Sequence, residues 1–173
     1  GNVTFELNAQ SAPLSASHFL SLVEGGLYKG TIFNRVIRQP FPFVLQGGFK
    51  DSKYDLESKL KSKDESYIQK NNVALSKIPL EIKLQGEDKP RYNKIIYKYD
   101  EFNRIELKHN RGALAMARSE SLDSASIQFY IPLKDLPELD GRYAVFGRVV
   151  NGMNVIDSLN EGDFILNMKV IKD

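Results

Sequence analysis

The chain has 173 residues, of which 42% are hydrophobic and 27% are charged, and its net charge is +2. This length fits one domain with a sizeable buried core, and the small net charge gives no argument for binding nucleic acid or an anionic membrane. The absence of cysteine excludes disulfides, a thiol nucleophile and cysteine-ligated metals. No apolar run reaches the roughly 18 residues of a membrane-spanning helix.

The first part of the chain alternates strand and helix patterns. No signal peptide is visible, and Gly1 leads straight into a strand pattern, which indicates a mature or shortened form. Apolar residues at every second position of 3–7 predict a half-buried strand. Residues 11–25 carry apolar side chains at helical spacing and predict a helix. Two short strands follow around a proline-broken turn, TIFNRVI (31–37) and FPFVLQGG (41–48).

The middle of the chain, residues 49–110, is charged, with 14 lysines and arginines against 11 aspartates and glutamates, a net +3. Residues 50–72 are polar without a clean period, so we interpret them as a surface excursion that is partly mobile. PLEI (79–82) and RIELK (104–108) have strand patterns. The basic excess is typical of a solvated face rather than of a binding patch.

The last third of the chain has compact, strongly apolar segments again. Three predicted strands are followed by a short helix and a closing strand: GALAMA (112–117), IQFYIPL (127–133), YAVFGRVV (143–150), the helix 152–159 and NMKVIK (167–172). Many short strands with only two helices predict a mainly β domain, a sandwich or a barrel.

Generic active-site constellations are mostly absent. His18 and His109 cannot form a convincing metal site, and we interpret both as structural or surface residues. The chain has no phosphate-binding glycine loop and no GxSxG turn. Asp123, Asp135 and Asp140 lie in loop-like segments, where a turn is the more usual role. We therefore expect no metal site.

Four motifs in order resemble the cyclophilins, the peptidyl-prolyl isomerases. They are FNRVI…FVLQGG, GALAMAR, SASIQFYIPL and LDGRYAVFGRVVNGMNVID. The resemblance covers residues 1–48 and about 105–165 and leaves the charged middle unmatched. The segments RQPFPF and IPLEIK look most like those of cyanobacterial and plastid-type members.

The resemblance implies a single domain over residues 1–173, with 49–110 as a variable charged loop region within it. The implied fold is mainly β, a closed eight-stranded antiparallel barrel capped by two α-helices, with the substrate groove outside. Closure removes exposed sheet edges. The family usually has another strand before the position of Val3, so a chain that starts at Gly1 lacks that strand or obtains it differently.

The implied activity is peptidyl-prolyl cis-trans isomerisation, in which X–Pro bonds of unfolded or flexible polypeptides are rotated to assist folding, without a cofactor. Arg35 matches the catalytic arginine of the family. Its guanidinium can donate to the lone pair that the proline nitrogen regains when the amide is twisted, a contact stronger in the transition state than in the ground state. Gln46 matches the glutamine that holds a substrate carbonyl and orients the arginine.

The resemblance implies eight further substrate-binding residues. They are Phe43, Val44, Ala117, Arg118, Gln128, Tyr130, Leu139 and Tyr143. Phe43, Tyr130 and Leu139 match the walls of the proline pocket. The backbone of Ala117 and Arg118 matches a pair that binds an extended peptide, and Gln128 matches a second polar groove residue.

Several positions depart from the family pattern. Val44 replaces a usual methionine, Tyr143 a frequent histidine and Ile127 a usual serine, and three extra residues precede Phe43. Glu138 stands where an aromatic side chain is common, and cyclosporin binding in the family depends on that side chain. We therefore expect weak cyclosporin binding.

Each match also has a structural alternative. Arg35 could be a strand-edge charge paired with a carboxylate, Gln46 could cap a strand, and Phe43, Tyr130 and Leu139 would be ordinary core residues in any β protein. The ordered motifs favour the catalytic interpretation, although no single residue does.

The functional alternative is a low-activity module that binds proline-containing segments as a chaperone or assembly factor. A nucleic-acid binder rests only on the lysines of residues 50–98, and the interleaved acids oppose it. The expected partners are proline-containing polypeptide clients of a monomer with no membrane span. The resemblance implies the periplasm or thylakoid lumen as the compartment, and otherwise the cytoplasm.

Overall fold

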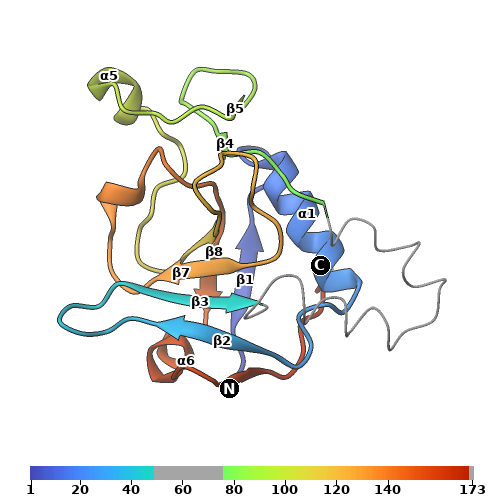
Figure 1. Ribbon diagram of the computed structural model, residues 1–173. Coiled ribbons are helices and arrows are strands. Elements are labelled where there is room, and N and C mark those ends of the chain that lie inside the picture. Colours follow the sequence, from blue (N-terminus) through green and yellow to red (C-terminus); the bar gives the residue numbers. More distant parts are fainter. Residues whose placement is uncertain (49–75, 172–173) are drawn as a thin grey trace.

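The structure, a computed structural model, describes residues 1–48 and 76–171. Its strands are β1 (Thr4–Leu7), β2 (Thr31–Val36), β3 (Val44–Gly48), β4 (Glu81–Ile82), β5 (Arg91–Tyr92), β6 (Ala113–Met116), β7 (Phe129–Pro132), β8 (Val145–Asn151) and β9 (Phe164–Ile165). Its helices are α1 (Pro13–Glu24), α5 (Tyr99–Phe102), the 3-10 helix η1 (Pro137–Leu139) and α6 (Met153–Ser158). Figure 1 shows β4, β5 and α5 at the top of the view, above the main sheet.

Most of the predicted elements are confirmed. The two expected helices are α1 and α6, and the strongest strand patterns became β1, β2, β3, β6, β7 and β8. The strand predicted at 104–108 is wrong, because only Ile105 forms a bridge, with Leu84. The strand predicted at 167–172 is also wrong in its described part, since β9 lies before it. The surface excursion predicted for residues 50–72 lies outside the described residues.

The main sheet has the antiparallel order β1-β8-β6-β7-β3-β2-β9, and it curls as a half-barrel (Figure 1). Within the described residues its end strands, β1 and β9, do not pair with each other. The expected closed eight-stranded barrel is therefore not what these residues form. The short length of β9, two residues, leaves little backbone with which to close the sheet.

The concave side of the sheet holds the main core, which α1 covers. The helix presents Phe19, Leu22 and Val23 at helical spacing, and all three are buried. The Phe19 ring packs against Tyr28, Phe129 and Phe146, with ring centroids 5.1–5.5 Å apart. Aromatic rings at this spacing stabilise a core beyond the area that they bury. These ring contacts therefore hold α1 against β7 and β8.

A β-bulge in β2 decides which face Arg35 occupies. Phe33 pairs with Gly47 and Arg35 pairs with Gln46, so Asn34 is an extra residue between the two pairs. Without a bulge, Phe33 and Arg35 would point to the same face, because side chains alternate along a strand. With it, the Phe33 ring stays in the core while Arg35 turns to the outer face. The arginine in an otherwise apolar strand is thereby kept out of the core.

The described part of the charged middle contains a small core of its own. Its buried apolar residues are Leu80, Ile82, Leu84, Ile96 and Ile105, packed with Ala144 of the main body. Glu81, also buried, accepts hydrogen bonds from the backbone N–H groups of Leu14 and Ser15 at the start of α1. Residues 78–105 are therefore tied to the body through both an apolar cluster and a helix cap.

Candidate active site

A row of side chains crosses four neighbouring strands on the outer face of the sheet. Arg35 on β2 pairs with Gln46 on β3, Gln46 with Tyr130 on β7, and Tyr130 with Ala115 on β6. Residues directly opposite each other in antiparallel strands point to the same face, with Cβ atoms about 4.5–5.5 Å apart. The predicted catalytic pair, Arg35 and Gln46, therefore lies side by side, with Tyr130 next in the row.

The polar end of this row is oriented by a second glutamine. The Gln46 side-chain amide donates a hydrogen bond to Oε1 of Gln128, the other polar groove residue predicted from the sequence. This bond uses the Nε2 side of Gln46 and leaves its Oε1 to face elsewhere. Arg35 is exposed, and within the described residues its guanidinium has no ion pair. The alternative of a strand-edge charge paired with a carboxylate finds no support there.

The apolar end of the row is a second hydrophobic cluster, separate from the main core. It contains six of the predicted groove residues, namely Phe43, Val44, Ala117, Tyr130, Leu139 and Tyr143. Val44 and Tyr130 are buried, and the other four are partly buried. These residues come from β3, β7, η1 and the segments beside β6 and β8. An apolar cluster partly open on the outer face, next to Arg35 and Gln46, has the character expected of a proline pocket.

Arg118 forms one side of this cluster. Its guanidinium carbon lies 4.8 Å from the centre of the Tyr143 ring, a cation–π contact. Its Nε and Nη2 also donate to the Arg142 carbonyl, at 3.1 and 2.7 Å. The Ala117 N–H is donated to the Gln128 carbonyl, so a peptide would have to use other backbone groups of this segment. The side chain of Arg118 therefore packs on the pocket wall.

Two residues missed as site residues stand directly behind the pocket. His109 and Asp140 are 2% and 4% exposed, and the ring of His109 lies between Asp140 and Tyr130. Burial, and then the neighbouring Tyr143, raise the pKa of Tyr130 well above its usual value. The sequence signal was weak: Asp140 follows the pocket residue Leu139. His18, by contrast, lies in α1, where it contacts the Ser126 carbonyl.

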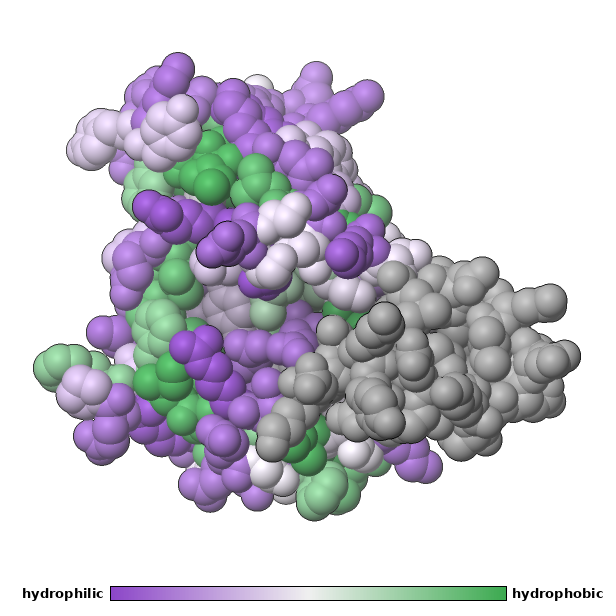
Figure 2. All heavy atoms as spheres, viewed as in Figure 1, coloured by the Kyte–Doolittle hydropathy of each residue, from purple (hydrophilic) through white to green (hydrophobic). Residues whose placement is uncertain are grey.

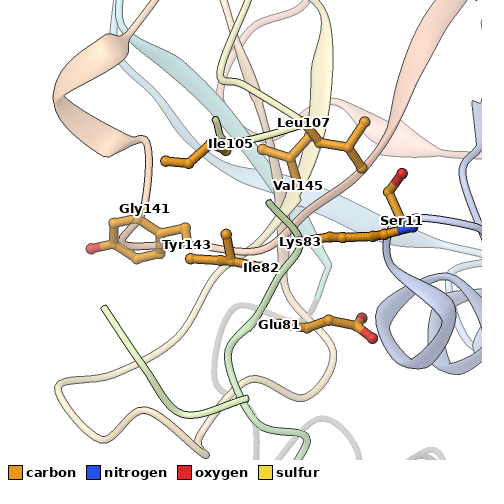
Figure 3. Close-up of a pocket in the computed structure, with 9 residues that line it drawn as sticks. All are labelled: Ser11, Glu81, Ile82, Lys83, Ile105, Leu107, Gly141, Tyr143 and Val145. Carbon is orange, nitrogen blue, oxygen red and sulfur yellow. The ribbon is translucent and has the colours of Figure 1, made fainter. Parts of the chain in front are cut away.

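A small cavity of about 10 Å³ lies beside Tyr143 (Figure 3). Its walls come from four parts of the chain and comprise Ser11, Glu81, Ile82, Lys83, Ile105, Leu107, Gly141, Tyr143 and Val145. This volume holds about one water molecule. The cavity is therefore too small for a prolyl ring, and the partly open apolar cluster, which shares Tyr143 and Val145 with it, is the better substrate site.

Figure 2 shows apolar side chains within a mostly hydrophilic surface, both on the part at the top that contains β4 and β5 (residues 78–105) and on the rest of the molecule below it. Within residues 1–48 and 76–171, no group of three or more histidines or carboxylates is placed to hold a metal ion. No described helix is long and apolar enough to cross a bilayer.

Comparison with known proteins accounts for this arrangement. The family described as cyclophilin type peptidyl-prolyl cis-trans isomerase/CLD matches residues 1–173. The chain belongs to the cyclophilin family. The match includes the residues of β4 and β5 as well as those of the main sheet.

Curated relatives are similar over nearly the whole of this cyclophilin. A peptidyl-prolyl cis-trans isomerase from Acinetobacter baylyi is 33% identical, over 92% of this chain and 66% of its own length. A protein from Synechocystis named as a thylakoid lumen peptidyl-prolyl cis-trans isomerase is 32% identical, over 99% of this chain and 44% of its own length. The chain thus spans about two thirds of the first relative and less than half of the second.

Solved cyclophilin structures share the fold. Cyclophilin AquaCyp293 from Hirschia baltica superposes with a TM-score of 0.65 at 24% identity, covering 95% of this chain and 68% of that one. A cyclophilin type peptidyl-prolyl cis-trans isomerase from Cryptosporidium parvum, crystallised in the presence of the dipeptide Ala-Pro, has a TM-score of 0.55 at 27% identity. It covers 92% of this chain and 78% of that one.

Proposed function

We propose that this cyclophilin is a peptidyl-prolyl cis-trans isomerase that binds an X–Pro segment across the outer face of β2, β3 and β7. One observation carries this proposal. The β2 bulge places Arg35 opposite Gln46, next to an apolar cluster that is partly open to solvent. The family match and the names of the relatives support it.

The chemistry requires no cofactor or proton transfer. Rotation about a peptide bond costs about 18–20 kcal/mol, because the amide loses resonance. In the twisted amide the proline nitrogen is pyramidal and carries a lone pair. The Arg35 guanidinium donates to that lone pair and thereby stabilises the transition state more than the ground state. The exposed position of Arg35 on the outer face supports this role.

The remaining groups bind and orient. We assign the prolyl ring to the cluster of Phe43, Tyr130, Leu139 and Tyr143, where its apolar carbons lose contact with water. Gln46, which donates one hydrogen bond to Gln128, offers its amide oxygen or its second N–H to the substrate backbone or to Arg35. The clients are proline-containing polypeptides. Of the compartments that the resemblance implies, the name of the Synechocystis relative supports the thylakoid lumen.

A protease-coupled assay on a short X–Pro peptide tests the proposal. We expect Arg35→Ala to lower kcat/KM by roughly 10²–10³-fold, the usual loss for one preorganised donor, with an unchanged circular dichroism spectrum. Arg35→Lys should retain little of the wild-type kcat/KM, because lysine lacks the planar guanidinium of arginine. Arg148→Ala is the matched control, since Arg148 is an exposed strand arginine on β8. Near-normal turnover of the Ala variant would refute the mechanism.

A binding module with little turnover is the second candidate. The exposed position of Glu138 on η1, where an aromatic wall is common in the family, favours it. The two candidates differ in one measurement. If the unmodified protein binds an Ala-Pro peptide without accelerating its isomerisation, the chain is the binding module.

A further inference from the structure

A chain of hydrogen bonds runs behind the pocket cluster. Nε2 of His109 lies 2.8 Å from the Tyr130 hydroxyl, and Nδ1 lies 2.9 Å from Oδ1 of Asp140. The same Oδ1 accepts the backbone N–H of His109 at 2.7 Å. All three side chains are buried, so each of these bonds is shielded from water. These hydrogen bonds therefore join the segment before β6 to β7 and to the end of η1.

The donor and the acceptor in each of these hydrogen bonds follow from the chemistry of the three side chains. A carboxylate only accepts, so Nδ1 of His109 carries the proton that faces Asp140. In a neutral imidazole the other nitrogen is then an acceptor, and the Tyr130 O–H donates to Nε2. Burial keeps the Tyr130 hydroxyl protonated, since it raises the pKa of that group. The order is thus Tyr130 O–H to His109, and His109 N–H to Asp140.

This arrangement links several pocket walls. Tyr130 forms one wall, and Asp140 directly follows Leu139, which forms another. The Tyr143 ring stands edge-on to Tyr130 at 5.8 Å and to His109 at 6.4 Å, so a third wall packs on the same pair. Leu139 and Tyr143 lie four residues apart around a turn in which the Arg142 N–H donates to the Leu139 carbonyl, whereas Tyr130 lies on β7. The hydrogen bonds through His109 join these two segments.

We propose that Asp140 and His109 are positioning residues that hold the Tyr130 ring and the Leu139 segment at the spacing required by a prolyl ring. This assignment deepens the proposed function and rests on it. Because the Tyr130 hydroxyl is hydrogen-bonded to His109, it points away from the outer face, and the wall that Tyr130 forms stays apolar. Neither residue touches the substrate, because both lie behind the wall.

Two single variants and their combination separate positioning from simple stabilisation. His109→Leu leaves the Tyr130 hydroxyl buried without its partner, and the hydroxyl should turn toward the pocket. We expect KM for an X–Pro peptide to rise roughly tenfold with little change in kcat, in line with the effect of one orphaned polar group. Tyr130→Phe keeps the ring and should have a smaller effect. The double variant removes both partners and should recover most of the lost affinity.

The two histidines provide a direct readout by NMR, in which the imidazole nitrogens of His109 and His18 are observed in the folded protein. We expect His109 to show the Nδ1–H form, and a saturating X–Pro peptide to shift its Nε2 resonance through Tyr130. His18 is the internal control, since it is also buried but lies in α1, where it contacts the Ser126 carbonyl.

The outcomes distinguish this inference from the proposed function. If the peptide shifts the resonances of the Gln46 side-chain amide but not those of the His109 ring, the positioning role is overturned and the binding of the peptide still stands. The same holds if His109→Leu and the double variant have equal KM values. If the peptide shifts neither group and the unmodified protein shows no turnover, the proposed function fails, and the positioning role falls with it.

Discussion

Replacing Glu81 should destabilise the fold far more than its place in a two-residue strand implies. Helix α1 has Ala12 as its N-cap, with no side-chain cap of its own. The carboxylate of Glu81 takes that role from β4. Its oxygens accept the N–H of Leu14 at 3.0 Å and of Ser15 at 2.7 Å, and also the Tyr92 hydroxyl at 3.0 Å.

The magnitude follows from these contacts. Loss of an N-cap acceptor costs about 0.5–2 kcal/mol. A buried donor left without a partner costs about 1–3 kcal/mol, and the Ser15 N–H is buried. Because both costs include the Ser15 N–H, they overlap, and we expect Glu81→Ala to lower the free energy of unfolding by about 2–4 kcal/mol. Glu81→Gln keeps one acceptor oxygen at the same volume, so about half of that loss is expected.

Urea denaturation followed by circular dichroism measures both values, and equal slopes would show that the same surface is exposed on unfolding. Glu161→Ala is the control, since Glu161 is exposed and a surface change of this kind stays within about 0.5 kcal/mol. If Glu81→Ala is no less stable than this control, the carboxylate does not cap α1 in solution. If Glu81→Gln lowers the free energy of unfolding as much as Glu81→Ala does, the negative charge of Glu81, and not its acceptor geometry, stabilises the start of α1.

Three further outcomes are expected. Cyclosporin should inhibit the isomerase weakly and Glu138→Trp should strengthen inhibition; tight inhibition of the unmodified protein would show that other residues build this wall. Burial and the hydrogen bond to Glu81 raise the pKa of Tyr92 to about 12. The stability that this shift contributes is present below the usual value of 10.0 and is lost as pH rises toward 12, so Tyr92→Phe should remove one late step from a spectrophotometric tyrosine titration. Gly47→Ala would place a Cβ 2.9 Å from the Phe33 ring, and thermal unfolding should show a loss of about 1–3 kcal/mol; an unchanged midpoint would mean that the ring moves freely.

The local patterns of the sequence determined six of the seven strands of the main sheet, all except β9. Alternation of apolar residues marked the strands that became β1, β2, β3, β6, β7 and β8, because each buries one or both faces. Helical spacing marked α1 and α6 in the same way. Where the pattern was weak, as at 104–108, the prediction of a strand was wrong, since a few alternating residues do not specify a pairing partner. The ordered motifs located Arg35, Gln46 and the apolar groove residues, although their roles remain predictions.

Only the tertiary structure decided which groups meet. A bulge at Asn34 turns Arg35 to the outer face, and the residue pattern of β2 does not predict this bulge. Glu81 caps a helix that starts 68 positions earlier in the chain. His109 and Asp140 looked like a turn residue and a loop residue, yet they are buried together behind Tyr130. The physical reason is the same in each case. A periodic pattern records which face of an element avoids water, whereas a hydrogen bond between distant segments depends on where the whole chain places its donor and acceptor.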